Sequence, residues 1–195
     1  YLTYYVVNNL GLKPLLFHVD AGWNSNISST NIEMIVEKYN LDLITHVVDW
    51  EEMKDLHLSY FKAGVPSIDT IQDHAFFGAL YNYVEKNNIK FVLTGGNYST
   101  EFIRPPLSWA YHASDARQIK DIHKKFGQKK INYFPYYDIF RSRIYLRILK
   151  GVKVFNLLDL IDYNKEHAIA ELKKNIGWLP YGGKHHESRF TKFFE

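Results

Sequence analysis

The stretch KPLLFHVDAG, residues 13–22, decides the fold. It is a short apolar run closed by an aspartate and a glycine. A strand that is covered on both faces needs no alternation of polar and apolar residues, so this run predicts a buried strand. Patterns of the same kind continue along the chain, with strands predicted in 41–50 and 89–97 and helices in 25–40, 51–64 and 71–88. This alternation predicts an α/β fold in which helices flank a parallel sheet.

The two ends of the chain extend this pattern. YLTYYVVNNLGL, residues 1–12, predicts a helix that ends at Asn8, Asn9 and Gly11. After residue 101 the pattern is less regular, with helices predicted in 114–127 and 138–151 and a short strand followed by a helix in 152–177. We therefore predict one domain, with 1–101 as its α/β core and 102–195 as an extension of the same domain.

Composition excludes several classes of site. The 195 residues carry a formal net charge of +3, and the chain contains no cysteine. Disulfides and thiolate metal sites are therefore excluded within the chain. The charge is too small to indicate binding to nucleic acid, and the basic run 117–130 is interpreted as a solvated helix face. Apolar runs are short and interrupted by charges, so no membrane span is predicted.

Two loops at the predicted carboxyl ends of strands carry candidate ligand groups. The sequence TGGN, 94–97, places backbone N–H groups where they can face an anion, although a tight turn explains the two glycines equally well. In HVDAGWNS, 18–25, the backbone of 19–21 can bond an adenine edge, while Asp20 can serve a ribose or a metal. The alternative is that His18 is a core histidine and Asp20 a helix cap.

Two further segments are ambiguous in the same way. Asp69 precedes the helix in 71–88 as a capping residue, and Gln72 and Asp73 can reach a ligand cleft from its first turn. In YGGKHHES the adjacent histidines 185 and 186 point apart on an extended chain and form a poor metal pair, so no metal site is predicted. Lys184, after two glycines, fits a phosphate or oxyanion contact better.

Five segments together resemble one family: LLFHVDAGWNS, VPSIDTIQDHAFFGALY, LTGGNYSTE, SWAYHASDARQIKDIHKKFG and GWLPYGGKHHESRFTKFF. They are similar to the N-acetyl sugar amidotransferases of lipopolysaccharide and nonulosonic-acid biosynthesis, which belong to the PP-loop ATP pyrophosphatase superfamily. The resemblance covers nearly the whole chain. It implies an adenine nucleotide alpha hydrolase-like sheet, with the nucleotide bound by 1–101 and the sugar by 102–195.

The resemblance also implies a reaction. A cytoplasmic enzyme of this family is expected to use ATP and Mg²⁺ to adenylate the amide oxygen of an N-acetyl sugar or nucleotide sugar. Ammonia from a partner glutaminase subunit then displaces AMP and leaves an acetamidino group. Adenylation supplies the good leaving group that an amide lacks, and cations must stabilise the developing phosphate charge.

Site residues follow from the matched motifs. The expected catalytic residues are Lys184 and Glu187. The expected ATP-binding residues are His18, Val19, Asp20, Ala21, Gly95, Gly96 and Asn97. The expected substrate-binding residues are Glu101, Arg104, Trp109, Asp115, Arg117 and His186, since the guanidinium group suits carboxylates and phosphates.

The chain also departs from the family pattern. The phosphate loop Ser-Gly-Gly-x-Asp-Ser, which lies between the first strand and the first helix of the superfamily, does not occur in this sequence. The family's N-terminal cysteines are also absent. Since 1–9 resembles the helix after that loop, we expect the sequence to begin just behind it and to bind ATP poorly by itself. Another PP-loop chemistry such as tRNA thiolation, or a non-catalytic nucleotide-binding module, remains as an alternative.

Overall fold

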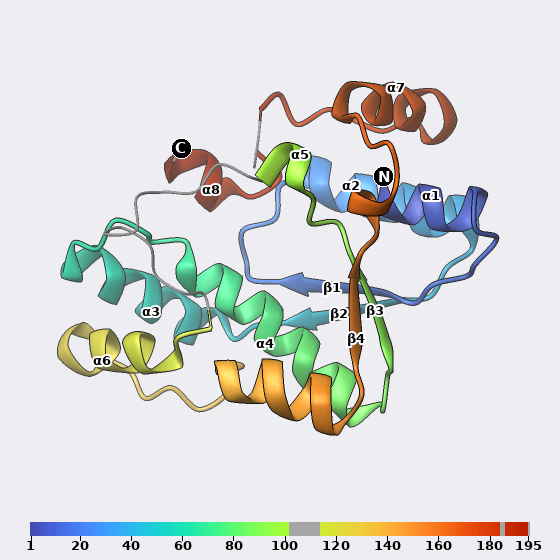
Figure 1. The fold of residues 1–195 in the computed structure, drawn as a ribbon. Coiled ribbons are helices and arrows are strands. Elements are labelled where there is room, and N and C mark those ends of the chain that lie inside the picture. The colour runs from blue at the N-terminus through green and yellow to red at the C-terminus, as the bar shows by residue number, and fades with distance from the viewer. Residues whose placement is uncertain (102–113, 184–185, 195) are drawn as a thin grey trace.

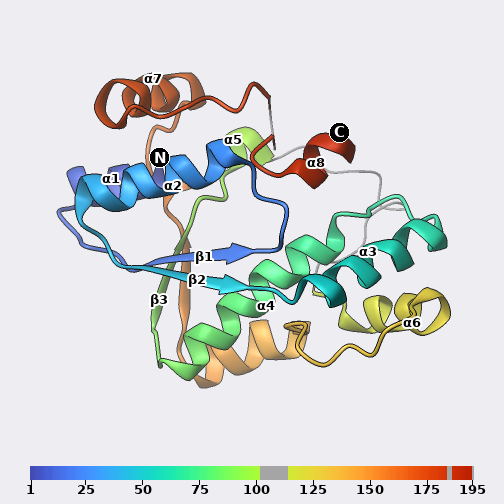
Figure 2. The same cartoon turned by 180° about the vertical axis from the view of Figure 1, so that it is seen from behind.

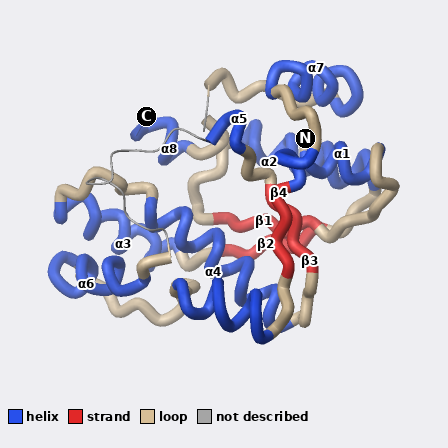
Figure 3. Tube along the Cα trace, viewed as in Figure 1, coloured by secondary structure: helices blue, strands red, loops and turns tan. Residues whose placement is uncertain are grey.

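The computed structural model describes residues 1–101, 114–183 and 186–194. Four short strands run through the middle, and helices surround them (Figure 1, Figure 3). The strands are β1 Leu16–Asp20, β2 Leu43–Val47, β3 Phe91–Thr94 and β4 Lys153–Asn156. The helices are α1 Leu2–Asn8, α2 Asn26–Tyr39, α3 Trp50–Ala63, α4 Thr70–Lys86, α5 Tyr98–Glu101, α6 Ala116–Phe126, η1 Phe140–Leu149, η2 Leu157–Leu160, α7 Lys165–Ile176 and α8 Arg189–Phe194.

The helices predicted near the N-terminus and in 25–40, 51–64, 71–88, 114–127 and the second part of 152–177 are confirmed. Local capping explains two of the boundaries. The Ser25 hydroxyl accepts the Ser28 N–H at the start of α2, and Asp49 Oδ1 accepts the Glu52 N–H at the start of α3. The helix predicted in 138–151 is a π-helix over Phe140–Leu149. Its wider turn follows from backbone hydrogen bonds that residue spacing does not specify.

The strands pair as two parallel ladders. Leu16 lies opposite Leu43 in β1–β2, and Phe91 lies opposite Lys153 in β3–β4. These parallel pairs among helices agree with the predicted α/β class, but the prediction of one continuous sheet is wrong for the described residues, which form two two-stranded sheets. The reason is that β3 takes its partner from 153–156 and leaves its other edge, like that of β1, without a strand.

Helices cover both sides of the first ladder. Figures 1 and 2 show α1 and α2 on one side of β1 and β2 and α4 on the other. Phe17 of β1 meets Tyr83 of α4 with ring centroids 5.0 Å apart. Gly78 of α4 permits a close approach of the Pro135 backbone, because a Cβ atom at position 78 would lie 1.8 Å from the Pro135 carbonyl oxygen. Helix α4 is thus held between β1 and the later part of the chain.

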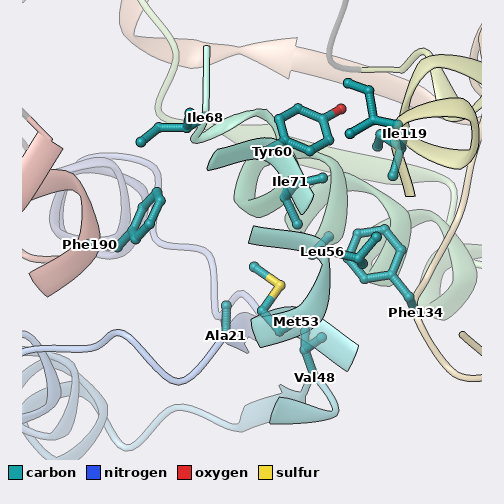
Figure 4. Packing of buried hydrophobic residues seen from close by; sticks show 12 residues of the cluster. Ala21, Val48, Met53, Leu56, Tyr60, Ile68, Ile71, Ile119, Phe134 and Phe190 are labelled. Carbon is teal, nitrogen blue, oxygen red and sulfur yellow. The ribbon is translucent and has the colours of Figure 1, made fainter. Parts of the chain in front are cut away.

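Two buried clusters form the core. The larger joins α3, α4 and α6 with Phe134 and Phe190, and Met53, Leu56 and Ile71 in it are fully buried (Figure 4). The smaller joins α4 to β3 and η1 through Tyr81, Val84, Val92, Tyr137, Leu146 and Val152. Since burial of apolar area is the main stabilising term, α4 is the element on which both clusters depend.

Two carboxylates of α3 order the segment after α6. Glu52 is 5% exposed, and its two oxygens accept the N–H groups of Asn132, Tyr133 and Phe134 at 2.6–3.1 Å. Asp55 accepts the N–H groups of Gln128 and Lys129 and pairs with His123 at 2.8 Å. Burial alone would raise the pKa of Asp55, but these bonds outweigh it and hold the pKa below its ordinary value.

We expect Glu52→Gln to lower the free energy of unfolding by about 2–3 kcal/mol, because the amide NH₂ cannot accept the N–H bonds that one carboxylate oxygen now accepts. The measurement is urea denaturation at pH 7. The matched control is Glu51→Gln, since Glu51 is exposed on the same helix and pairs only with Lys129 on the surface. Equal shifts of the midpoint in both variants would contradict the role given to Glu52.

Candidate functional site

A cavity of about 1220 Å³ lies between β1 and β3, and its lining also includes α1, α2, α4 and the C-terminal segment. Along the strands its walls are apolar. At one end, polar side chains gather from four separate segments: His18, Asn24, Ser28, Asp69, Gln72, Asp73, Tyr181, Glu187, Ser188 and Thr191. This polar end is the candidate site, because apolar concavities with a few convergent polar groups are typical of ligand pockets.

The loop after β1 and the C-terminal segment are joined by backbone hydrogen bonds. The Ser25 N–H donates to the Glu187 carbonyl at 2.9 Å, and the Arg189 N–H donates to the Trp23 carbonyl at 2.8 Å. Asn24 and Ser188 form an antiparallel bridge between the two segments. The motif HVDAGWNS and residues 187–189, more than 150 residues apart in sequence, therefore form one wall.

Gln72 connects the start of α4 to this wall. It is 4% exposed, its Oε1 accepts the Ser188 hydroxyl at 3.3 Å, and its Nε2 donates to the Thr191 hydroxyl at 3.4 Å. Asp69 precedes α4 and accepts the Ser67 hydroxyl at 3.2 Å; its side chain makes no capping bond to the helix. Asp69 and Asp73 both face the cavity, where the positive end of the α4 dipole favours them.

His18 is neutral at this site. Burial lowers its pKa, and the nearby Asp20 opposes that shift only in part. Its Nε2 lies 3.0 Å from the Asn24 amide nitrogen. Since that nitrogen is a donor, His18 Nε2 accepts, which puts the ring proton on Nδ1. The Nδ1–H of the imidazole can thus donate to an uncharged acceptor such as a base nitrogen or a hydroxyl oxygen.

Aromatic rings pack against the C-terminal segment of the site, residues 186–191. The His57 ring packs tilted against Phe190 with centroids 4.3 Å apart, and the Trp23 ring lies 5.2 Å from Phe190 and 5.9 Å from His57. Among the residues that the structure describes, His57 Nε2 and Trp23 Nε1 are buried without a hydrogen-bond partner. His57 Nδ1 donates to the Met53 carbonyl, but burial dominates and lowers the pKa of His57 to about 4.

The expected ATP-binding residues separate into two places. His18, Val19 and Ala21 line the cavity. Asp20 instead accepts the Gly22 N–H at 2.8 Å, which closes the loop after β1. Gly95, Gly96 and Asn97 are not in the cavity lining and lie where β3 ends beside β4.

The glycine loop 94–97 leads into α5. Asn97 Oδ1 accepts the Thr100 N–H at 3.0 Å, and the Tyr98 N–H donates to Asp159 at 2.8 Å. A smaller hollow of about 400 Å³ lies here, between Ser99, Thr100 and 163–166. A Cβ at Gly95 would meet no atom within 4 Å, so that backbone is open to a ligand.

The other expected residues are distributed more widely. Glu187 lines the cavity. The His186 ring lies over Gly183, where a Cβ would come within 2.4 Å of it. Asp115 caps α6 by accepting the N–H groups of Arg117 and Gln118, and Arg117 is exposed. Arg104, Trp109 and Lys184 lie outside the described residues, and so does the side chain of Glu101.

Ser188 and Thr191 are site residues that sequence reasoning missed. Both residues carry a hydroxyl group and lie three positions apart in the C-terminal motif, at the start of a helix. Residues with this spacing share one helix face, and this is the signal that could have indicated a shared contact with Gln72. The sequence did place Gln72 and Asp73 near a ligand cleft, and both line the cavity.

No family model, curated protein or solved structure matches this chain. Within 1–101, 114–183 and 186–194, three or more His, Asp or Glu side chains do not gather as metal ligands would. The helices in those ranges are also too short or too polar to cross a membrane.

The pKa of His57 predicts a pH effect. Because its folded value of about 4 lies below that of an unfolded histidine, near 6.5, the unfolded chain binds the proton first as the pH falls. Stability should fall from pH 6.5 and reach a loss of about 3 kcal/mol near pH 4, at about 1.4 kcal/mol per pKa unit. In His57→Phe this dependence should shrink, as measured by urea unfolding at pH 7 and 4.5. His167→Phe, at an exposed histidine of α7, should keep the parent slope.

Loss of the Gln72 amide should make the C-terminal segment 186–194 less stably packed. Gln72→Leu removes the contacts to Ser188 and Thr191 while keeping the side-chain volume, so hydrogen exchange over 186–194 should become about 10-fold faster. The measurement is exchange followed by mass spectrometry at pH 7. Gln128→Leu, whose side chain is exposed, should leave that exchange unchanged. Unchanged exchange in Gln72→Leu would contradict the anchoring role.

Proposed function

We propose that this chain belongs to an ATP-dependent N-acetyl sugar amidotransferase of the PP-loop pyrophosphatase type. One observation supports the proposal most. Three of the five segments that carry the resemblance, 15–25, 65–81 and 177–194, contribute residues to the polar end of one cavity although they are far apart in sequence. Residues that are similar to a family only by chance have no reason to converge in space.

The proposed reaction has two steps. The amide oxygen of the acetamido group attacks the α-phosphorus of ATP, and pyrophosphate leaves. Ammonia from the glutaminase partner then attacks the activated carbon, and AMP leaves with the former amide oxygen, so that the product carries an acetamidino group. Both steps develop negative charge on phosphate oxygens, which preorganised donors and cations stabilise.

The described residues fit the adenosine half of ATP better than the triphosphate half. Neutral His18 and the backbone of 19–21 offer hydrogen-bonding groups to adenosine. The cavity lining contains Asp69, Asp73 and Glu187 but, as far as the chain is described, neither lysine nor arginine. A triphosphate needs positive charge, so the proposal assigns that role to Lys184 and to the Mg²⁺ that accompanies the ATP phosphates.

The sugar would be bound on the side of 102–195. In the proposal, Arg104 and Arg117 face an acidic sugar or the diphosphate of a nucleotide sugar, and Trp109 and His186 stack against it. The proposal assigns Glu187, which lines the cavity, to the ammonia step, where it can accept a proton from the attacking nitrogen.

Lys184→Ala tests the proposal in the natural full-length protein with its glutaminase. We expect kcat/KM for acetamidino formation to fall about 100-fold or more, because a cation on the transferring phosphate is lost. AMP and pyrophosphate are measured with an N-acetyl sugar and glutamine present. Lys192→Ala, at an exposed residue of α8, is the control.

Two outcomes would contradict the proposal. Full activity of Lys184→Ala removes its assigned role. Partner binding without any formation of AMP and pyrophosphate in the parent protein indicates a nucleotide-binding module instead. The 195 residues by themselves should form no AMP from ATP, and their activity would show that no additional phosphate loop is needed.

A further inference from the structure

We infer that the π-helix η1 is a docking surface for a phospholipid bilayer that carries anionic lipid. This helix covers Phe140–Leu149 and lies at the edge of the molecule, beside the C-terminal end of α4, where Figure 1 draws it in orange. Its role at a bilayer is independent of the reaction proposed above. Three observations carry it: an exposed apolar strip, an opposite face fixed to the core, and cations beside the strip that have no acidic partner.

The outer face of η1 is apolar. Five large apolar side chains of the helix and its N-cap are 43–70% exposed: Ile139, Phe140, Ile144, Ile148 and Leu149. In a π-helix each N–H bonds the carbonyl five positions back, as the Lys150 N–H does to Tyr145 at 2.9 Å, so residues four or five positions apart share a face. The five residues have this spacing and form one strip, whereas the tighter α-helical turn would distribute them around the helix.

The opposite face of η1 is fixed to the core. Leu146 is fully buried and belongs to the smaller core cluster with Tyr81 and Val84 of α4. On the same side, the Arg141 guanidinium pairs with the Glu85 carboxylate of α4 at 2.6 Å. These contacts orient the helix, so the apolar strip faces away from the protein.

Unpaired positive charge borders the strip. Arg143 lies four positions after Ile139 and five before Ile148, and Arg147 lies one turn further on; both arginines are exposed. Within the described ranges neither arginine forms a salt bridge. The stretch 139–153 contains no aspartate or glutamate. Three further exposed lysines lie around the C-terminal end of η1: Lys90, Lys150 and Lys153.

An anionic bilayer fits both the strip and the cations. Interfacial helices bury an apolar face at the boundary between headgroups and acyl chains, and anionic headgroups attract lysine and arginine beside that face. A second copy of this chain would bring the arginines of the two copies together, and like charges oppose such an interface. An acidic protein would satisfy the charge but would need an apolar groove to cover the strip, whereas a bilayer adapts to a helix at the edge of a molecule.

Sedimentation with sucrose-loaded vesicles tests the inference in the natural full-length protein. The vesicles contain phosphatidylcholine alone or phosphatidylcholine with about 30% phosphatidylglycerol. We expect binding to the anionic vesicles to be at least about 10-fold tighter than to the neutral ones. Raising NaCl from about 0.1 to about 0.5 M should weaken it, because salt screens the attraction.

Charge variants locate the contact. Arg143→Gln/Arg147→Gln should weaken binding to the anionic vesicles by about 20-fold, at about five-fold for each cation near the surface. The matched control is Lys173→Gln/Lys174→Gln. It removes the same charge from exposed residues of α7, which lies at the opposite end of the molecule from η1 (Figures 1 and 2), and should leave binding unchanged.

Apolar variants separate insertion from attraction by charge alone. Ile148→Ser should weaken binding to the anionic vesicles by about 10-fold, because an aliphatic side chain is no longer removed from water. Leu160→Ser is the control, since Leu160 in η2 is 71% exposed and Ile148 is 70% exposed. Neither change removes a buried side chain, so both variants should keep the parent fold.

Four results would overturn the inference. Absence of binding to the anionic vesicles would leave the strip to an acidic protein surface. Equal binding to neutral and anionic vesicles would remove the role of the cations, and equal losses in the η1 variants and their controls would place the contact elsewhere. A concentration-dependent dimer in sedimentation velocity that Ile148→Ser dissociates would make a second copy the occupant.

Discussion

Backbone hydrogen bonding along β1 and β3 is the constraint on which this structure depends. Within the described residues, each strand is paired on one edge, β1 with β2 and β3 with β4. The other two edges face one cavity, and the helices α1, α2 and α4 pack around it. A parallel strand normally has partners on both edges and helices on both faces. The apolar part of the cavity and the polar site at its end are thus consequences of the same arrangement.

The site depends on contacts between segments that are distant in sequence. The segment 186–191 is held by backbone bonds to the loop after β1, by Gln72 at the start of α4, and by the rings of Trp23 and His57. Helix α3 in turn is fixed by the bonds that Glu52 and Asp55 accept from 128–134. A change in α3 is therefore expected to reach the site through the aromatic contacts, although no residue of α3 is part of the cavity lining.

The electrostatic character of the site bears on the proposed chemistry. Three carboxylates and His18, whose pKa is lowered by burial, line the polar end, while Lys184 and Arg104, which are expected to contact phosphate, lie outside the described residues. These carboxylates would repel a nucleotide phosphate, which could bind only with compensating positive charge. Within the proposal, Lys184 and the Mg²⁺ that accompanies ATP supply that charge. The glycine loop 94–97 opens instead toward the smaller hollow beside η2 and α7.

The sequence by itself determined the elements: apolar runs such as 13–22 and capped periodic segments such as 25–40 specify strands and helices through local geometry. It also indicated polar groups at strand ends, and His18, Gln72 and Asp73 do line the cavity. Only the tertiary structure decided that β3 pairs with β4 and that Ser188 and Thr191 meet Gln72. Strand partners and long-range side-chain contacts depend on how whole elements pack, and residue spacing carries no direct record of that packing.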